Sequence, residues 1–174
     1  ISRASKIYSQ FEIFIKTKKI VGEILEFGVF KGNSLSRLIL MRDIHTPTKK
    51  IYGFDTFKTI KPNLTDIDFN KYNMFINDSG SSQPSKKELE LSLKKRNMYE
   101  NVLLIKGDVK NTFPHKEIKK VSFVLLDLDL YKPTAHILKY IWPKLSYGGI
   151  ILLDNYNVFE GETKAVNEFI KIKK

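Results

Sequence analysis

The 174-residue sequence predicts a doubly wound α/β fold, in which helices cover both faces of a mainly parallel sheet. Three observations lead to this prediction. Five short apolar runs are typical of buried strands, helical patterns alternate with them, and each run ends at or near an acidic residue or a glycine. Ligands of open α/β sheets bind beyond the carboxyl ends of the strands, so these endings predict where a site lies.

The predicted strands lack charge on both faces apart from Glu26, as is typical of strands in a parallel sheet. They lie at residues 24–27, 51–54, 102–105, 121–126 and 149–153. The runs end at or near Glu26, Asp55, Gly107 with Asp108, Asp127, and Asp154. Right-handed helical crossovers are expected to join them. Helices are predicted at about residues 5–18, after Asn33-Ser34, after Pro84-Ser85, from Pro133-Thr134 to near Gly148-Gly149, and from about Glu162 onward.

Residues 1–174 are predicted to form a single domain, since no linker or internal repeat interrupts them. Residues 56–84 are polar and only weakly periodic, and a loop of that length is typical of a lid or binding segment. A poorly ordered insertion is the alternative. No apolar run approaches the roughly 20 residues of a membrane span, so no membrane partner and a cytoplasmic location are expected.

Composition excludes several classes of site. The chain has no Cys, which excludes disulfide scaffolds, thiolate metal centres and cysteine nucleophiles. The formal charge is +11, and such an excess suggests nucleic acid as a partner. However, the basic residues are mostly lysines spread in pairs along the chain, with little of the arginine that favours bidentate phosphate binding. A nucleic-acid partner is therefore not expected.

A glycine-containing turn follows the first predicted strand. Gly28 and Gly32 would allow a tight turn and a close approach to a ligand, and the next helix begins at Asn33-Ser34. The turn is not a complete dinucleotide fingerprint, because Phe30 occupies the second glycine position, and it is not a P-loop. A plain strand-to-helix turn without a ligand is the alternative.

Acids at the ends of neighbouring strands indicate which chemical groups the ligand carries. Glu26 could hold an ammonium group, Asp55 could accept ribose hydroxyls, and Asp108 would lie near an adenine. A ligand with an amino-acid head, a ribose and an adenine fits this set better than NAD does. The predicted cofactor-binding residues are Glu26, Phe27, Gly28, Val29, Phe30, Gly32, Asn33, Ser34, Asp55, Thr56, Gly107, Asp108, Val109 and Asp127.

Four oxygen-bearing residues follow the two last predicted strands: Asp127, Asp129, Asp154 and Asn155. Carboxylates gathered at one sheet edge repel one another, so they need a cation or protons. Oxygen ligands without Cys or His suit Mg²⁺, Mn²⁺ or Ca²⁺ better than Zn²⁺. Acids that cap helices or face solvent are the alternative.

Several motifs together resemble the macrocin O-methyltransferase (TylF-like) family. They cover residues 26–34, 52–57, 127–134 and 148–156, with weaker likeness at 78–80, 106–109 and 112–114. The resemblance implies a Rossmann-like class I methyltransferase fold, S-adenosylmethionine as methyl donor, and a divalent metal, usually Mg²⁺ with Mn²⁺ as the alternative. It also implies a final antiparallel hairpin, and the sequence is expected to lack it because it stops at Lys174.

The resemblance further implies O-methylation of a sugar or other small-molecule or glycan hydroxyl. By this likeness Asp129 ligates the metal and is the first candidate for the general base, while Asp127 is a ligand or orients Asp129. Lys132 is a rival base, because Asp129 to Lys132 is similar to the Asp-x-x-Lys of catechol-type O-methyltransferases. Alternative functions are a nucleic-acid methyltransferase and a non-catalytic nucleotide-binding module. A homo-oligomer is left open.

Overall fold

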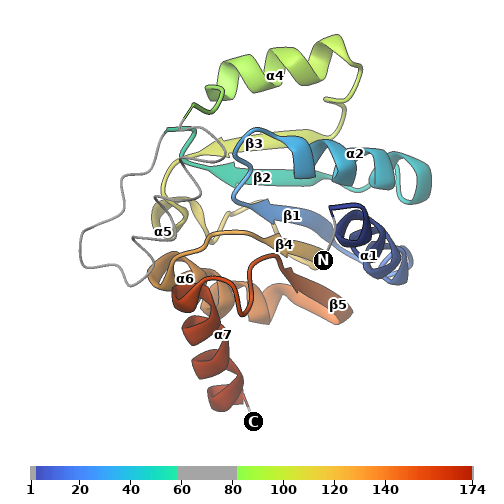
Figure 1. The fold of residues 1–174 in the computed structure, drawn as a ribbon. Coiled ribbons are helices and arrows are strands. Elements are labelled where there is room, and N and C mark those ends of the chain that lie inside the picture. The colour runs from blue at the N-terminus through green and yellow to red at the C-terminus, as the bar shows by residue number, and fades with distance from the viewer. Residues whose placement is uncertain (1–2, 59–81, 174) are drawn as a thin grey trace.

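A five-stranded parallel sheet with the order β3-β2-β1-β4-β5 forms the centre of the molecule (Figure 1). The computed structural model describes residues 3–58 and 82–173. The strands are β1 Glu23–Phe27, β2 Ile51–Asp55, β3 Val102–Lys106, β4 Val121–Leu126 and β5 Leu145–Leu153. The chain moves outward from β1 to β3 and then returns to the other side of β1. The switch point between β1 and β4 is where such sheets bind ligands.

Helices cover both faces of this sheet, and alternate residues of each strand contact opposite layers. They are α1 Arg3–Lys16, α2 Asn33–His45, α4 Lys86–Lys95, α5 Val109–Thr112, α6 Tyr131–Ile141 and α7 Glu160–Lys173. Ile24 of β1 packs in a core with residues of α1, α2 and α4. Its neighbour Leu25 packs in a second core with residues of α5, α6 and α7. The period of two along the strand therefore separates the two layers.

The predicted doubly wound sheet and its five strands are confirmed, but several boundaries differ: α2 already begins at Asn33, with Gly32 as its N-cap, and two boundaries between the fourth helix and the last strand are wrong. The fourth predicted helix ends at Ile141, not near Gly148-Gly149, and β5 begins at Leu145 instead of residue 149. A 3₁₀ turn at Trp142–Lys144 separates the two elements. Pro143 lies in its first turn and cannot donate the N–H that a continuing α-helix needs.

Most of the predicted lid falls outside the described residues, because residues 59–81 are not placed. On its far side, α4 begins with the predicted capping box. The Ser85 hydroxyl accepts the Glu88 N–H, and the Glu88 carboxylate accepts the Ser85 N–H at 2.8 Å. Within the described ranges 3–58 and 82–173, no helix has the length and apolarity to cross a bilayer.

Candidate functional site

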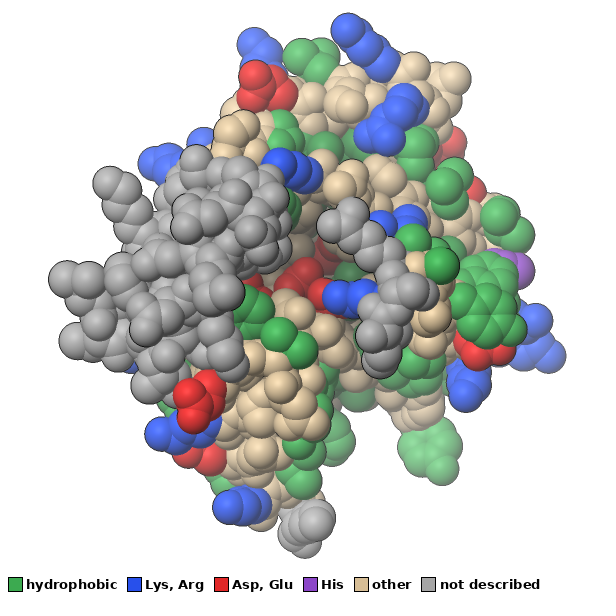
Figure 2. Space-filling view, viewed as in Figure 1, with side chains coloured by type: hydrophobic (Ala, Val, Ile, Leu, Met, Phe, Trp, Pro, Cys, Tyr) green, Lys and Arg blue, Asp and Glu red, His purple; other side chains and the backbone are tan. Residues whose placement is uncertain are grey.

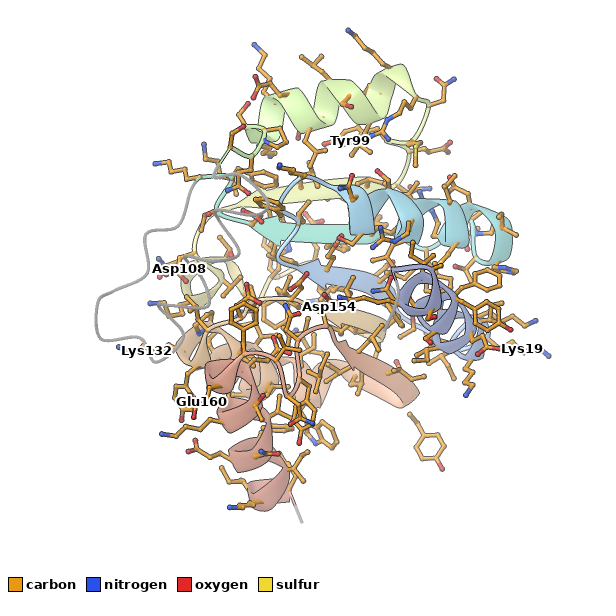
Figure 3. The ribbon with its side chains drawn as sticks, in the orientation of Figure 1. Lys19, Tyr99, Asp108, Lys132, Asp154 and Glu160 are labelled. Carbon is orange, nitrogen blue, oxygen red and sulfur yellow. The ribbon has the colours of Figure 1, made fainter. Side chains whose placement is uncertain are left out.

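The carboxyl ends of β1, β2, β4 and β5 bring most of the predicted site residues to one edge of the sheet. Figure 3 shows Asp154 near the middle of this edge, with Asp108 and Lys132 farther to one side. Asp108 caps α5 by accepting the Lys110 N–H at 2.9 Å. Its proposed contact with an adenine stays a prediction, as do those of its neighbours Gly107 and Val109.

The turn after β1 approaches β4 more closely than a side chain would allow. Gly28 has φ +92°, and a Cβ there would lie 1.8 Å from the Asp127 carbonyl oxygen. The Gly28 N–H donates to the Phe54 carbonyl at 2.9 Å. The turn is therefore held between β2 and β4, directly beside the first acid of the metal prediction.

Asp55 fixes the rest of the turn. One carboxylate oxygen, Oδ2, accepts the N–H groups of Val29 at 2.9 Å and Phe30 at 2.8 Å. Phe30 has φ +47°, a conformation that non-glycine residues adopt only when held. Oδ1 accepts the Phe57 N–H at 2.7 Å. The residue predicted to bind ribose thus organises the glycine turn, and the ribose contact itself stays a prediction.

Glu26 presents a buried carboxyl beneath the turn. It is fully buried, and the Ser34 hydroxyl at the start of α2 donates to its Oε1. Its Oε2 has no hydrogen-bond partner among the described residues. Burial raises the pKa of Glu26 to about 8. An ammonium group would supply the missing donor, which is what the sequence predicted for this position.

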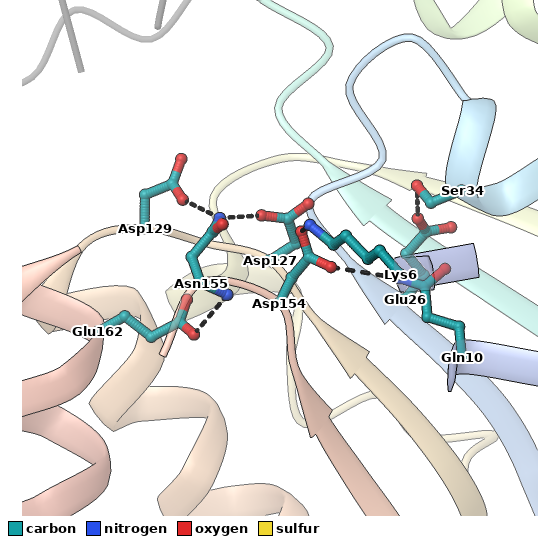
Figure 4. Close-up of polar contacts among 9 residues, drawn as sticks. All are labelled: Lys6, Gln10, Glu26, Ser34, Asp127, Asp129, Asp154, Asn155 and Glu162. Carbon is teal, nitrogen blue, oxygen red and sulfur yellow. Dashed lines mark hydrogen bonds and ion pairs between the residues drawn. The ribbon is translucent and has the colours of Figure 1, made fainter. Parts of the chain in front are cut away.

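Asp127, Asp129, Asp154 and Asn155, here called the acidic cluster, come together beyond β4 and β5 (Figure 4). The Asn155 amide Nδ2 donates to Asp127 Oδ1 at 2.7 Å and to Asp129 Oδ1 at 2.6 Å. Burial, followed by the charges of Asp154 and Asp129, raises the pKa of Asp127 well above its usual range. The fold therefore favours a proton on Asp127 when no cation lies beside it.

Two residues of α1 also reach the acidic cluster, and no sequence pattern indicates them. Lys6 Nζ forms an ion pair with Asp154 Oδ2 at 2.6 Å, and Gln10 Nε2 donates to Asp154 Oδ1 at 3.3 Å. The two residues are one helical turn apart and so share a face of α1. Their spacing in the sequence does not show that both contact Asp154, which lies 148 positions from Lys6 and 144 from Gln10.

The donor chemistry of the acidic cluster fits a hard divalent cation, but the arrangement is not a preformed cage. Carboxylate and amide oxygens are the ligands that Mg²⁺ and Mn²⁺ prefer. In the part of the chain that the structure describes, no three acidic or His side chains surround a common metal position. Instead, an Asn155 N–H group lies between Asp127 and Asp129, and the Lys6 ammonium neutralises Asp154.

The two candidate bases occupy different environments. Asp129 has φ +60° and lies in the acidic cluster. Lys132 is exposed in the first turn of α6, and no described hydrogen bond or ion pair in residues 3–58 and 82–173 joins it to the acidic cluster. The structure therefore brings Asp129 to the predicted metal ligands and leaves Lys132 at the surface.

The chain is similar in sequence to known O-methyltransferases. The chain is 27% identical over 157 residues to demethyldecarbamoylnovobiocin O-methyltransferase of Streptomyces niveus, a match that covers 86% of the chain and 58% of the enzyme. It spans between 54% and 58% of the length of three such curated relatives.

Solved structures give the same picture of the fold. The O-methyltransferase NovP superposes with a TM-score of 0.80 at 24% identity, covering 98% of the chain and 72% of NovP. CalS11, a TDP-rhamnose 3′-O-methyltransferase of calicheamicin biosynthesis, gives 0.65 at 24% identity, covering 95% and 70%. The fold is that of the Rossmann-like class I methyltransferases. The profile described as Macrocin-O-methyltransferase (TylF) matches residues 5–174, and the chain therefore belongs to this family.

Proposed function

We propose that this chain carries the methyl-donor and acceptor sites of an S-adenosylmethionine-dependent O-methyltransferase that acts on a hydroxyl of a sugar or other small molecule. One observation carries the proposal: the glycine turn beside Glu26 and the acidic cluster adjoin at the switch point of the sheet. The Gly28 backbone packs so closely against the Asp127 carbonyl that a Cβ at Gly28 would collide with it. The glycine turn and the acidic cluster are therefore in direct contact. A donor in the turn and a hydroxyl at the acidic cluster would then be neighbours.

The donor half of the site offers complementary groups for each part of S-adenosylmethionine. Glu26 Oε2, which has no hydrogen-bond partner among the described residues, would accept a hydrogen bond from the ammonium group. Asp55 would lie against the ribose, and Gly107 to Val109 would border the adenine. The match to relatives that methylate novobiocin precursors and TDP-rhamnose supports a sugar or natural-product acceptor.

In the acceptor half, Asp129 would take the proton. The acceptor oxygen forms its bond to the donor methyl carbon as the carbon–sulfur bond breaks, and the hydroxyl proton passes to the Asp129 carboxylate. Holding the two reactants in line would supply much of the acceleration. Asp127, Asp129, Asp154 and Asn155 would hold a divalent cation, Mg²⁺ or Mn²⁺, which when bound lowers the pKa of a coordinated hydroxyl.

Substitution of the two candidate bases tests this assignment. Asp129→Asn should reduce methyl transfer to a panel of deoxysugar nucleotides and glycosides by at least about 100-fold, the usual contribution of a general base. Its affinity for S-adenosylmethionine, measured by calorimetry, should change little. Lys132→Ala is the matched control and should keep transfer within about twofold. A chain that binds no S-adenosylmethionine would refute the donor site, and an active Asp129→Asn would refute the base.

A further inference from the structure

Glu162 is a carboxylate of the site that neither the sequence patterns nor the proposed reaction uses. It lies in the first turn of α7 and has no exposed surface. A fully buried carboxylate is costly unless hydrogen bonds or charges compensate it. An acid in the first turn of a helix is ordinarily a surface residue that stabilises the helix dipole. Its burial therefore needs another explanation.

The contacts of Glu162 join the two loops that form the acidic cluster. Its Oε1 accepts the Asn155 N–H at 3.3 Å, beyond β5 (Figure 4). Its own N–H donates to the Asp129 carbonyl at 3.2 Å, beyond β4. Asp129 has φ +60°, a backbone conformation that needs support from its surroundings. One residue of α7 thus holds both the candidate base and the candidate amide ligand.

The second carboxylate oxygen points to a missing positive charge. Oε2 of Glu162 is buried and has no hydrogen-bond partner among the described residues. The charges of Asp129 and Asp154 that act on this carboxyl are also negative, and within the described ranges only the backbone N–H groups of Asn155 and Asp129 offset them. Lys6 neutralises Asp154, and no described ion pair does the same for Glu162. A buried carboxylate oxygen without a hydrogen-bond partner is stabilised when a cation binds nearby.

We propose that Glu162 is a positioning residue for Asp129 and Asn155, and that its negative charge strengthens the binding of a divalent cation at the acidic cluster. The cation itself rests on the proposed function. A purely structural acid would instead act only through the Asn155 hydrogen bond. The two roles separate in Glu162→Gln, because the amide oxygen can still accept the Asn155 N–H while the charge is lost.

The test measures Mn²⁺ binding by electron paramagnetic resonance. Glu162→Gln should weaken Mn²⁺ binding by about tenfold or more, the range found for residues that support metal ligands. Its affinity for S-adenosylmethionine should not change. Glu160→Gln is the matched control, since it removes the same charge from the exposed side of the same turn and should leave Mn²⁺ affinity within about twofold.

Glu162→Asp provides a second variant that keeps the charge but shortens the reach to Asn155. It should retain Mn²⁺ affinity within about threefold and lower kcat with an unchanged KM for the donor. Unchanged Mn²⁺ binding in Glu162→Gln, or no Mn²⁺ binding by the unaltered chain, would overturn the inference. The Mn²⁺ measurements do not need methyl transfer, so a chain that methylates no sugar yet loses Mn²⁺ affinity in Glu162→Gln would refute only the proposed function.

Discussion

Glu26, Asp127 and Glu162 are carboxyls that the fold buries near one another with few donors. Burial raises the pKa of Glu26 to about 8 and that of Glu162 to about 7, and it raises the pKa of Asp127 well above its usual range. In water the same groups would ionise near pH 4. Such shifts cluster at functional sites, because a group that lacks a partner in the free protein can gain one from a ligand.

The pKa of Glu26 predicts a specific loss of stability with pH. Between about pH 4.5 and 8 the folded chain keeps a proton on Glu26 that the unfolded chain has released. Stability therefore falls as pH rises through this window, by up to about 1.4 kcal/mol per unit. Glu26→Gln removes this contribution, so its free energy of unfolding should fall less between pH 5.5 and 8 than that of the unaltered chain.

Urea unfolding at several pH values measures the difference. Glu100→Gln is a matched control, because Glu100 is exposed and its described contact uses only its backbone carbonyl. This variant should follow the unaltered chain. If Glu26→Gln shows the same pH slope as Glu100→Gln, Glu26 is ionised in the folded protein and its pKa is not raised.

At the scale of the elements, the glycine turn after β1 depends on its two glycines unequally. A Cβ at Gly28 would meet the Asp127 backbone at 1.8 Å, and backbone cannot move without disturbing β4. A Cβ at Gly32, where φ is +78°, would meet the Leu89 Cδ1 at 2.7 Å, the flexible end of a side chain. The first glycine is therefore required by the fold itself, and the second mainly by its backbone conformation.

Alanine at each glycine tests this difference. Gly28→Ala should lower the free energy of unfolding by about 3 kcal/mol or more, from overpacking added to backbone strain. Gly32→Ala should lower it by about 1–2 kcal/mol, the cost of a left-handed conformation alone. Chemical unfolding compares the two variants directly. Equal losses would mean that the backbone of β4 yields to the new side chain.

The elements also show what the sequence could predict. Buried parallel strands need apolar residues on both faces, so the five runs and their acidic endings were visible without the structure. The predicted end of the fourth helix lies too far along the chain. The helical pattern continues into the 3₁₀ turn at Trp142–Lys144, where Pro143 interrupts the α-helix. Lys6 and Glu162 were missed, because a charged residue in a helix has the same local pattern whether it faces water or a site. Only the packing of α1 and α7 brings them to the acidic cluster.

For the whole molecule, net charge and site charge have opposite signs. The chain carries a formal charge of +11, and Figure 2 shows lysine and arginine side chains dispersed around the visible face, acidic side chains at several places on its edge, and a central hollow in which acidic side chains lie beside a basic one. Most of the lysines thus lie on the surface away from the acidic cluster, where Lys6 pairs with Asp154. Because the acidic side chains of the site face one another in a confined space, added cations should affect the stability of the molecule more than its net positive charge does.

This arrangement predicts that pH and divalent cations act together on stability. Glu26, Asp127 and Glu162 bind protons more tightly in the folded chain, so the free energy of unfolding should fall from near pH 5.5 to near pH 8. The exposed capping residue Glu88 has a lowered pKa, so its contribution changes only below about pH 4.5, outside this window. Cations bind only the ionised carboxylates, so millimolar Mg²⁺ should stabilise the chain near pH 8 and hardly at all near pH 5.5. Urea unfolding with Mg²⁺ or with EDTA at both pH values measures this. Stabilisation of equal size at the two pH values would place the bound Mg²⁺ outside the acidic cluster.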